Sequence, residues 1–177
     1  MIIDLLQTVI NYSKLKPQIY ITQIDGYVHE SVYIFHLTVP KNVRFNQSIL
    51  EQKKFAKLKK IDCNGNIRIS SVNHLADTLE ELKCNGCRGI NQIGISKLTK
   101  LKVLKCHNNG KIHDINHLAN ALIELNCSGY CGINQKGLSQ LKYLRKLNCS
   151  GNTNISDVNY LYNTLVSLSG QPCTCMC

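Results

Sequence analysis

The sequence predicts an α/β solenoid, in which short parallel strands stack into one ladder and short helical segments close each coil. Two observations lead to this fold class. The stretch Cys84–Leu104 recurs without a gap forty-three residues later, as Cys127–Leu147. Half of that unit is itself repeated, because the pattern L-x-x-(L/I)-x-C returns every 21 or 22 residues. A fixed period of this size is typical of repeat proteins, and the copies predict about five to six coils.

Each copy of the pattern predicts one short strand. The first leucines of the copies are Leu58, Leu79, Leu101, Leu122, Leu144 and Leu165. The cysteines that follow five residues later are Cys63, Cys84, Cys106, Cys127 and Cys149. Each cysteine lies two residues after an apolar residue, so both side chains point to one face of a strand and the polar residue between them points to the other. We expect strands that begin near the leucines, with the cysteines buried.

The second half of each copy predicts the outer arc that closes the coil. Apolar residues spaced by three, such as Ile69, Val72 and Leu75, suit a helical or 3₁₀ turn. Alternate copies stretch the first spacing to five, as between Ile90 and Ile95. The difference accounts for the alternation between 21 and 22 residues, and it predicts two alternating kinds of outer arc.

This pattern resembles that of leucine-rich repeats, a family of solenoid proteins. Cys87, Gly89 and Ile90 match the cysteine-containing subclass found in F-box/leucine-rich-repeat proteins. Other copies carry an asparagine at the same position, namely Asn66, Asn109 and Asn152, and in leucine-rich repeats this residue bonds backbone groups of neighbouring turns. The chain is also similar, in its Ile, Lys and Asn richness, to leucine-rich-repeat proteins of giant DNA viruses. The resemblance implies a protein-binding solenoid over residues 55–170.

The remaining residues flank the solenoid on both sides. Residues 1–54 lack cysteine and lack the repeat, and they predict a mixed α+β N-terminal cap for the first coil. Within them, Asp25-Gly26 favours a hairpin turn between two strand-like stretches. The stretch DLLQTVINY resembles the first helix of an F-box, which would bind a ubiquitin-ligase scaffold. Residues 171–177 form a Cys-rich tail, for which prenylation, a soft metal ion and no role are alternatives.

The ten cysteines indicate a reducing intracellular compartment, the cytoplasm of the cell or of a host cell. A buried thiol behaves as a small apolar side chain, and parallel side chains on adjacent strands have poor geometry for disulfides. A zinc site formed by Cys84, Cys87, Cys127 and Cys131 is disfavoured, because two coils separate the pairs by about 10 Å. The sequence therefore predicts no metal and no cofactor.

Composition argues against several other classes of partner. No apolar run approaches a membrane span of roughly eighteen residues, and the N-terminal stretch has no basic region or cleavage site of a signal peptide. The net charge of +10 would suit nucleic acid, but the outward strand positions alternate in sign and lack interleaved aromatic residues. His74 and His117 follow the repeat, which is typical of packing or outer-arc surface positions, and no catalytic constellation emerges. We expect no enzyme activity.

The outward face of the strand ladder is the predicted binding site. Val103 and Ile123 are apolar outward residues on adjacent coils, and charged residues surround them. This arrangement of anchor and rim is typical of protein contacts. The residues predicted to form the face are Lys83, Lys102, Val103, Lys105, Ile123, Glu124 and Arg145. We predict a non-catalytic protein–protein interaction module with a protein partner; the alternatives are a substrate-recognition subunit of an SCF-type ubiquitin ligase and a Cys-based metal-binding protein.

Overall fold

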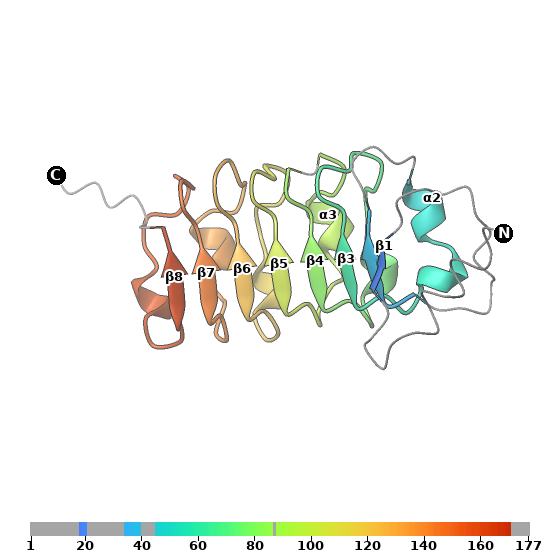
Figure 1. Ribbon diagram of the computed structural model, residues 1–177. Helices are drawn as coiled ribbons and strands as arrows, with labels where there is room; N and C mark the ends of the chain where they lie inside the picture. The colour runs from blue at the N-terminus through green and yellow to red at the C-terminus, as the bar shows by residue number, and fades with distance from the viewer. Residues whose placement is uncertain (1–17, 21–33, 40–44, 87, 171–177) are drawn as a thin grey trace.

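The fold is an α/β repeat solenoid built on one all-parallel sheet. The computed structural model describes residues 18–20, 34–39, 45–86 and 88–170. Eight strands lie side by side in chain order, and each pairs in parallel with the next (Figure 1). The strands are β1 (Gln18–Tyr20), β2 (His36–Thr38), β3 (Lys60–Asp62), β4 (Glu81–Lys83), β5 (Val103–Lys105), β6 (Glu124–Asn126), β7 (Lys146–Asn148) and β8 (Ser167–Ser169).

Short helical segments lie between successive strands and close the coils. They are α2 (Gln47–Leu50), η1 (Lys53–Phe55), η2 (Asn73–Leu75), α3 (Gln92–Ile95), η3 (Asn116–Leu118), η4 (Lys136–Leu138) and η5 (Asn159–Leu161). The two predicted kinds of arc differ in whether a side chain caps the first residues of the helical segment. Asn91 caps α3 by accepting a hydrogen bond from the Gly94 amide at 3.0 Å, whereas η2 and η3 begin without a side-chain cap.

The strands begin two residues later than the sequence predicts. Leu79 and Leu122 precede β4 and β6 and are fully buried. Their amides do not join the ladder, because the Leu79 amide donates to the Leu75 carbonyl oxygen at 2.8 Å and closes the preceding helical turn. The Leu122 amide does the same with Leu118 at 3.0 Å. Each strand is centred instead on the second apolar residue of the pattern, as in the register Leu82↔Leu104.

The ladder extends toward the N-terminus beyond the predicted boundary at residue 55. In β2, Leu37 pairs with Ile61 of β3, and Ile34, Leu37 and Val39 are buried. Their spacing is that of the L-x-x-L-x-C pattern, with valine in place of cysteine. β1 and β2 pair in parallel, so the antiparallel hairpin expected around Asp25-Gly26 is wrong for these strands. Paired residues of β1 and β2 lie eighteen positions apart in the sequence. This separation fits a crossover connection and is too long for a two-residue turn. The stretch that resembles an F-box helix lies outside the described residues.

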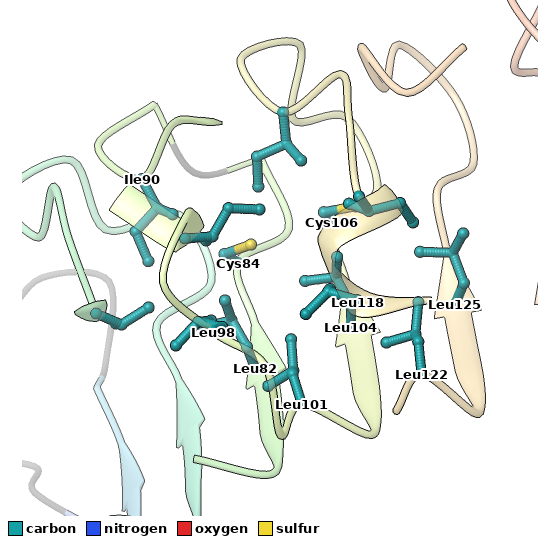
Figure 2. Packing of buried hydrophobic residues seen from close by; sticks show 14 of the residues in the cluster. Leu82, Cys84, Ile90, Leu98, Leu101, Leu104, Cys106, Leu118, Leu122 and Leu125 are labelled. Atoms are coloured by element: carbon teal, nitrogen blue, oxygen red, sulfur yellow. The ribbon is translucent and has the colours of Figure 1, made fainter. Parts of the chain in front are cut away.

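Inward-facing leucines and cysteines form one continuous core along the solenoid. Figure 2 shows Cys84 and Cys106 beside Leu82 and Leu104, between the strands and the outer arcs. The predicted burial of the five repeat cysteines is confirmed, since Cys63, Cys84, Cys106, Cys127 and Cys149 are all buried. Each is a free thiol. Removal from water favours the neutral thiol, and it raises the pKa of Cys127 and of Cys149 above the usual value.

A sixth buried cysteine contacts this column, and the sequence did not place it there. Cys131 lies beyond β6, and its Sγ is 3.6 Å from the Sγ of Cys106 in the preceding coil. The contact lowers the pKa of Cys131 and, together with burial, raises the pKa of Cys106. Cys131 therefore packs against Cys106 in the core.

Buried and half-buried amide side chains connect one coil to the next. Asn109 donates through Nδ2 to the carbonyl oxygens of Cys84 at 3.4 Å and Ile90 at 3.2 Å, both in the preceding coil. This bears out the expectation for the buried asparagines. On the outer arc, Gln92 donates to the Asp114 carbonyl oxygen at 2.7 Å and accepts from the Asp114 amide at 3.0 Å. The coils are thus joined by side chains as well as by the ladder.

Candidate functional site

The outward face of the strand ladder carries charged side chains that pair across coils. Lys60 of β3 bonds Glu81 of β4 with an N–O distance of 2.9 Å, and Lys105 of β5 reaches Glu124 of β6 at 2.9 Å. Lys83 lies 3.6 Å from Glu81, its neighbour on β4. Burial acts to raise the pKa of Glu81, but the hydrogen bond and charge of Lys60 outweigh it and lower that pKa. Most charges on this face are neutralised by a neighbour.

A second row of outward residues lies just before the strands, one from each coil. Along the solenoid this row reads Lys59, Glu80, Lys102, Ile123 and Arg145. Glu80 lies between two lysines, 3.4 Å from Lys59 and 2.9 Å from Lys102. The hydrogen bond from Lys102 lowers the pKa of Glu80, so this carboxylate stays ionised. The charged groups of Lys59, Glu80 and Lys102 therefore form ion pairs with one another.

All five members of the row border a hollow of about 550 Å³ on the surface, and Ile123 and Arg145 are the two at its C-terminal end. Ile123 and Tyr143 contribute its apolar part, with 40% and 58% of their surfaces exposed. Arg145 lines the same end of the hollow. An exposed isoleucine next to an exposed aromatic ring and a cation is the composition expected of an anchor point for a partner.

Arg145 differs from the other cations that line the hollow. Lys59 and Lys102 share Glu80, and Lys100 lies 3.6 Å from Asp77. Within the described ranges, no carboxylate lies close enough to the Arg145 guanidinium to form an ion pair. The hollow therefore has one end where three lysines share two carboxylates and one end, at Arg145, where the described residues supply no carboxylate partner.

The structure brings some of the predicted face residues together and separates others. Lys102, Ile123 and Arg145 line the hollow, whereas Val103, Lys105 and Glu124 lie beside it on the strands. Lys83 lines a second hollow of about 180 Å³ near β2 and β3. The sequence predicts that Val103 and Ile123 together form the apolar anchor, but only Ile123 lines the larger hollow.

Sequence reasoning missed Tyr143, which lines the hollow. It lies immediately before Leu144, outside the strand pattern of the repeat. The signal was available, since Thr78, Lys100, Ala121 and Tyr143 occupy one repeat position, at steps of 22, 21 and 22 residues. All four line the hollow. Of the four, only the tyrosine presents a large apolar surface.

Metal ions and membranes are two other kinds of partner that a site could serve. In the part of the chain that the structure describes, no group of three or more His, Cys, Asp or Glu side chains is arranged to hold a metal ion. Among the same residues, no helix has the length and apolar character needed to cross a membrane.

Neither protein-family models nor curated proteins give a relative that bears on this face. No protein-family model matches the chain, and a search of curated proteins finds no significant match.

Proposed function

We propose that the chain is a leucine-rich-repeat protein and acts as a non-catalytic protein–protein interaction module. Its partner would bind the strand-side face, centred on the hollow that Ile123, Tyr143 and Arg145 border. The observation that carries the proposal is the exposed pair Ile123 and Tyr143 within a rim of charged residues. Apolar anchors inside a polar rim are characteristic of protein contacts.

Two features support the leucine-rich-repeat assignment. The L-x-x-(L/I)-x-C pattern returns every 21 or 22 residues and places one parallel strand in each coil. The asparagine three residues after the repeat cysteine is buried and bonds backbone groups of the preceding coil, as Asn152 does with the carbonyl oxygens of Cys127 and Ile133. Buried free thiols also fit a reducing intracellular compartment.

The dimensions of the face suit a protein segment better than a small molecule. Five coils from β3 to β7 are separated by four strand spacings of about 4.8 Å, so the face is about 19 Å long. The hollow is open along this length, whereas small-molecule sites enclose most of their ligand. A long, shallow surface with local apolar anchors therefore favours a polypeptide.

The test uses charged substitutions on the face and matched substitutions elsewhere. The double variant Val103→Asp with Ile123→Asp places two carboxylates on the proposed site. The control, Ile67→Asp with Ile93→Asp, makes the same change at exposed isoleucines that border neither hollow. Each protein is used as bait for affinity capture from cells of the native host, and circular dichroism checks its fold.

The proposal expects a partner that the wild type and the control both capture and that the face variant loses. Charge buried against an apolar anchor is costly, so the loss should be at least about tenfold in captured partner. If the folded face variant retains every partner that the control retains, the strand-side face is not the binding site.

A further inference from the structure

We propose that the partner contributes an extended acidic segment that places a carboxylate on Arg145 and an apolar side chain against Ile123 and Tyr143. This inference rests on the proposed function and specifies the chemistry of the partner at the same hollow. It follows from the arrangement of charge within the hollow, from the apolar surface beside Arg145 and from the length of the site.

The charge of the hollow favours an anionic partner. Its lining contains four cations, Lys59, Lys100, Lys102 and Arg145, and two carboxylates, Asp77 and Glu80, so it carries an excess of two positive charges. The three lysines lie within ion-pairing distance of those carboxylates. The three lysines therefore keep one excess charge and Arg145 the other, but Arg145 alone of the four cations has no carboxylate within ion-pairing distance among the described residues, so an incoming carboxylate meets no competitor there.

The chemistry of Arg145 favours a carboxylate in particular. A guanidinium is planar and donates two parallel N–H groups to the two oxygens of a carboxylate, which adds directional specificity to the charge. In the described part of the chain, the Arg145 guanidinium has neither an ion-pair nor a hydrogen-bond partner. A carboxylate from the partner would supply both interactions without displacing an existing bond.

The apolar surface next to Arg145 distinguishes a peptide from other polyanions. Ile123 precedes Arg145 by one coil, and Tyr143 lies two residues before Arg145 in the same coil. Both side chains are exposed and border the hollow. A nucleic acid would need several aromatic platforms and a continuous row of free cations, and this row contains Glu80 and Ile123. A segment with an acidic residue near an aliphatic one matches both features.

The length of the hollow sets the length of the segment. Its lining runs from Lys59 to Arg145, across four strand spacings, or about 19 Å. An extended chain advances about 3.3 Å per residue, so about six residues would span the site. Residues two apart in an extended chain share one side, so the acidic and apolar side chains should be two positions apart.

The experiment measures binding of labelled hexapeptides to the full chain by fluorescence anisotropy. The probe EELLEE carries an acidic and an apolar residue two positions apart on each side. Two comparison peptides remove one property each: QQLLQQ lacks the charge, and EESSEE lacks the apolar side chains. A labelled oligothymidylate of similar length serves as the nucleic-acid probe at the same ionic strength.

Two arginine variants test where the probe binds. Arg145→Gln removes the unpaired charge, and Arg88→Gln makes the same change at an exposed arginine outside both hollows. We expect Arg145→Gln to weaken EELLEE binding about tenfold, because a hydrogen bond to a charged group is lost. Arg88→Gln should weaken it less than about twofold, as expected for a remote, screened charge. Arg145→Lys should fall between the wild type and Arg145→Gln.

The outcomes separate this inference from the proposed function. If Arg145→Gln and Arg88→Gln weakened EELLEE binding equally, net charge alone would account for the attraction, and the inference would be overturned. It would also be overturned if EESSEE bound as tightly as EELLEE, if oligothymidylate bound more tightly, or if no peptide bound. In each case, loss of a captured partner with Val103→Asp and Ile123→Asp would still support the protein-binding face.

Discussion

Single polar side chains hold each outer arc of the solenoid to the arc before it. His117 lies with Nε2 3.1 Å from the Ile95 carbonyl oxygen in the preceding coil. Tyr160 occupies the same repeat position one unit later and donates its hydroxyl to the Leu138 carbonyl oxygen at 3.3 Å. Two chemically different side chains thus satisfy equivalent carbonyl groups, and only the histidine changes its charge near neutral pH.

The first prediction concerns the acid stability that follows from His117. Burial lowers the pKa of His117 below its usual value of 6.5, although the bond to Ile95 acts in the opposite direction. The folded state therefore prefers the neutral ring. The stability that this ring contributes is present above pH 6.5 and is lost as the pH falls from 6.5 through the lower folded-state pKa. We expect the thermal unfolding midpoint to fall on acidification from pH 7 to pH 5.

The variant His117→Tyr provides the matched test. It places at this position the residue that the chain itself uses at Tyr160, so it keeps a donor for the Ile95 carbonyl oxygen and removes the titration. The difference between its unfolding midpoint and that of the wild type should shift in favour of the variant as the pH falls. The control His113→Tyr makes the same change at an exposed histidine and reports any general effect of the substitution. A parallel pH profile for wild type and His117→Tyr would contradict the assignment.

The sequence could predict the position of His117 but not its partner. The repeat phase shows that His117 and Tyr160 are equivalent, and this indicates a packing role. The carbonyl group that each side chain meets belongs to another coil, so the contact depends on the stagger of the arcs. The same reason explains Cys131, whose contact with Cys106 crosses a coil boundary that spacing alone did not reveal.

Outer arcs pack closely enough to exclude side chains at particular positions. A Cβ atom on Gly94 in α3 would overlap the Ser70 carbonyl oxygen, and one on Gly137 in η4 would overlap that of His113. The Gly94 carbonyl oxygen accepts a hydrogen bond from the Val72 amide at 2.9 Å, which holds the two arcs at this separation. The glycine is therefore required by the approach of neighbouring coils and not by an unusual backbone conformation.

The second prediction compares alanine at two glycines. Alanine normally stabilises a helix by about 0.5–1 kcal/mol relative to glycine. At Gly94 the overlap with the Ser70 backbone should outweigh this gain, and Gly94→Ala should lower the free energy of unfolding by about 1–3 kcal/mol. Gly110→Ala is the control, because its Cβ would meet only the Tyr130 carbonyl oxygen, at 3.6 Å. Urea denaturation should show a clear loss for the first variant and almost none for the second; equal losses would refute the explanation.

At the scale of an element, the sequence predicts each strand and arc but not where one ends and the other begins. The two-residue spacing within L-x-C identifies the strands, and the residues between them are outward as expected. The first leucines were placed in strands because they are apolar and periodic. The amides of Leu79 and Leu122 instead close the preceding helical turn, where they donate to Leu75 and Leu118. Hydrophobic spacing reports which side chains are inside, and it does not report which backbone group each amide bonds.

At the scale of the whole molecule, each strand pair contributes both to the core and to the outward face. The core could be predicted because one period places every inward residue in a column. The hollow could not be predicted from this period, because its lining combines residues at the strand edge with loop residues such as Asp77 and Tyr143. Its charge depends on which carboxylates reach which lysines, and this follows from the three-dimensional stagger of the coils. The unpaired state of Arg145 could therefore be recognised only in the structure.

The last prediction concerns the distribution of stability along the solenoid. In such proteins each coil gains stability from its neighbours, so a coil packed on one side should be the least stable. Within the described residues, β8 pairs only with β7. The central leucine of the strand is 1% exposed at Leu125 and 2% at Leu147, but 47% exposed at Leu168. The last coil should open locally before the rest.

Two identical substitutions measure this gradient. Leu125→Ala removes a side chain packed on both sides and should lower the free energy of unfolding by about 2–5 kcal/mol. Leu168→Ala removes a half-exposed side chain and should cost less than about 1 kcal/mol. Hydrogen exchange should agree, with the Cys149 amide, which donates to the Ser169 carbonyl oxygen at 3.0 Å, exchanging before the Cys106 amide, which donates to Asn126 at 2.8 Å. A cost at Leu168 equal to that at Leu125 would mean that another surface covers β8 in solution, because the contacts with β7 alone leave this leucine half exposed.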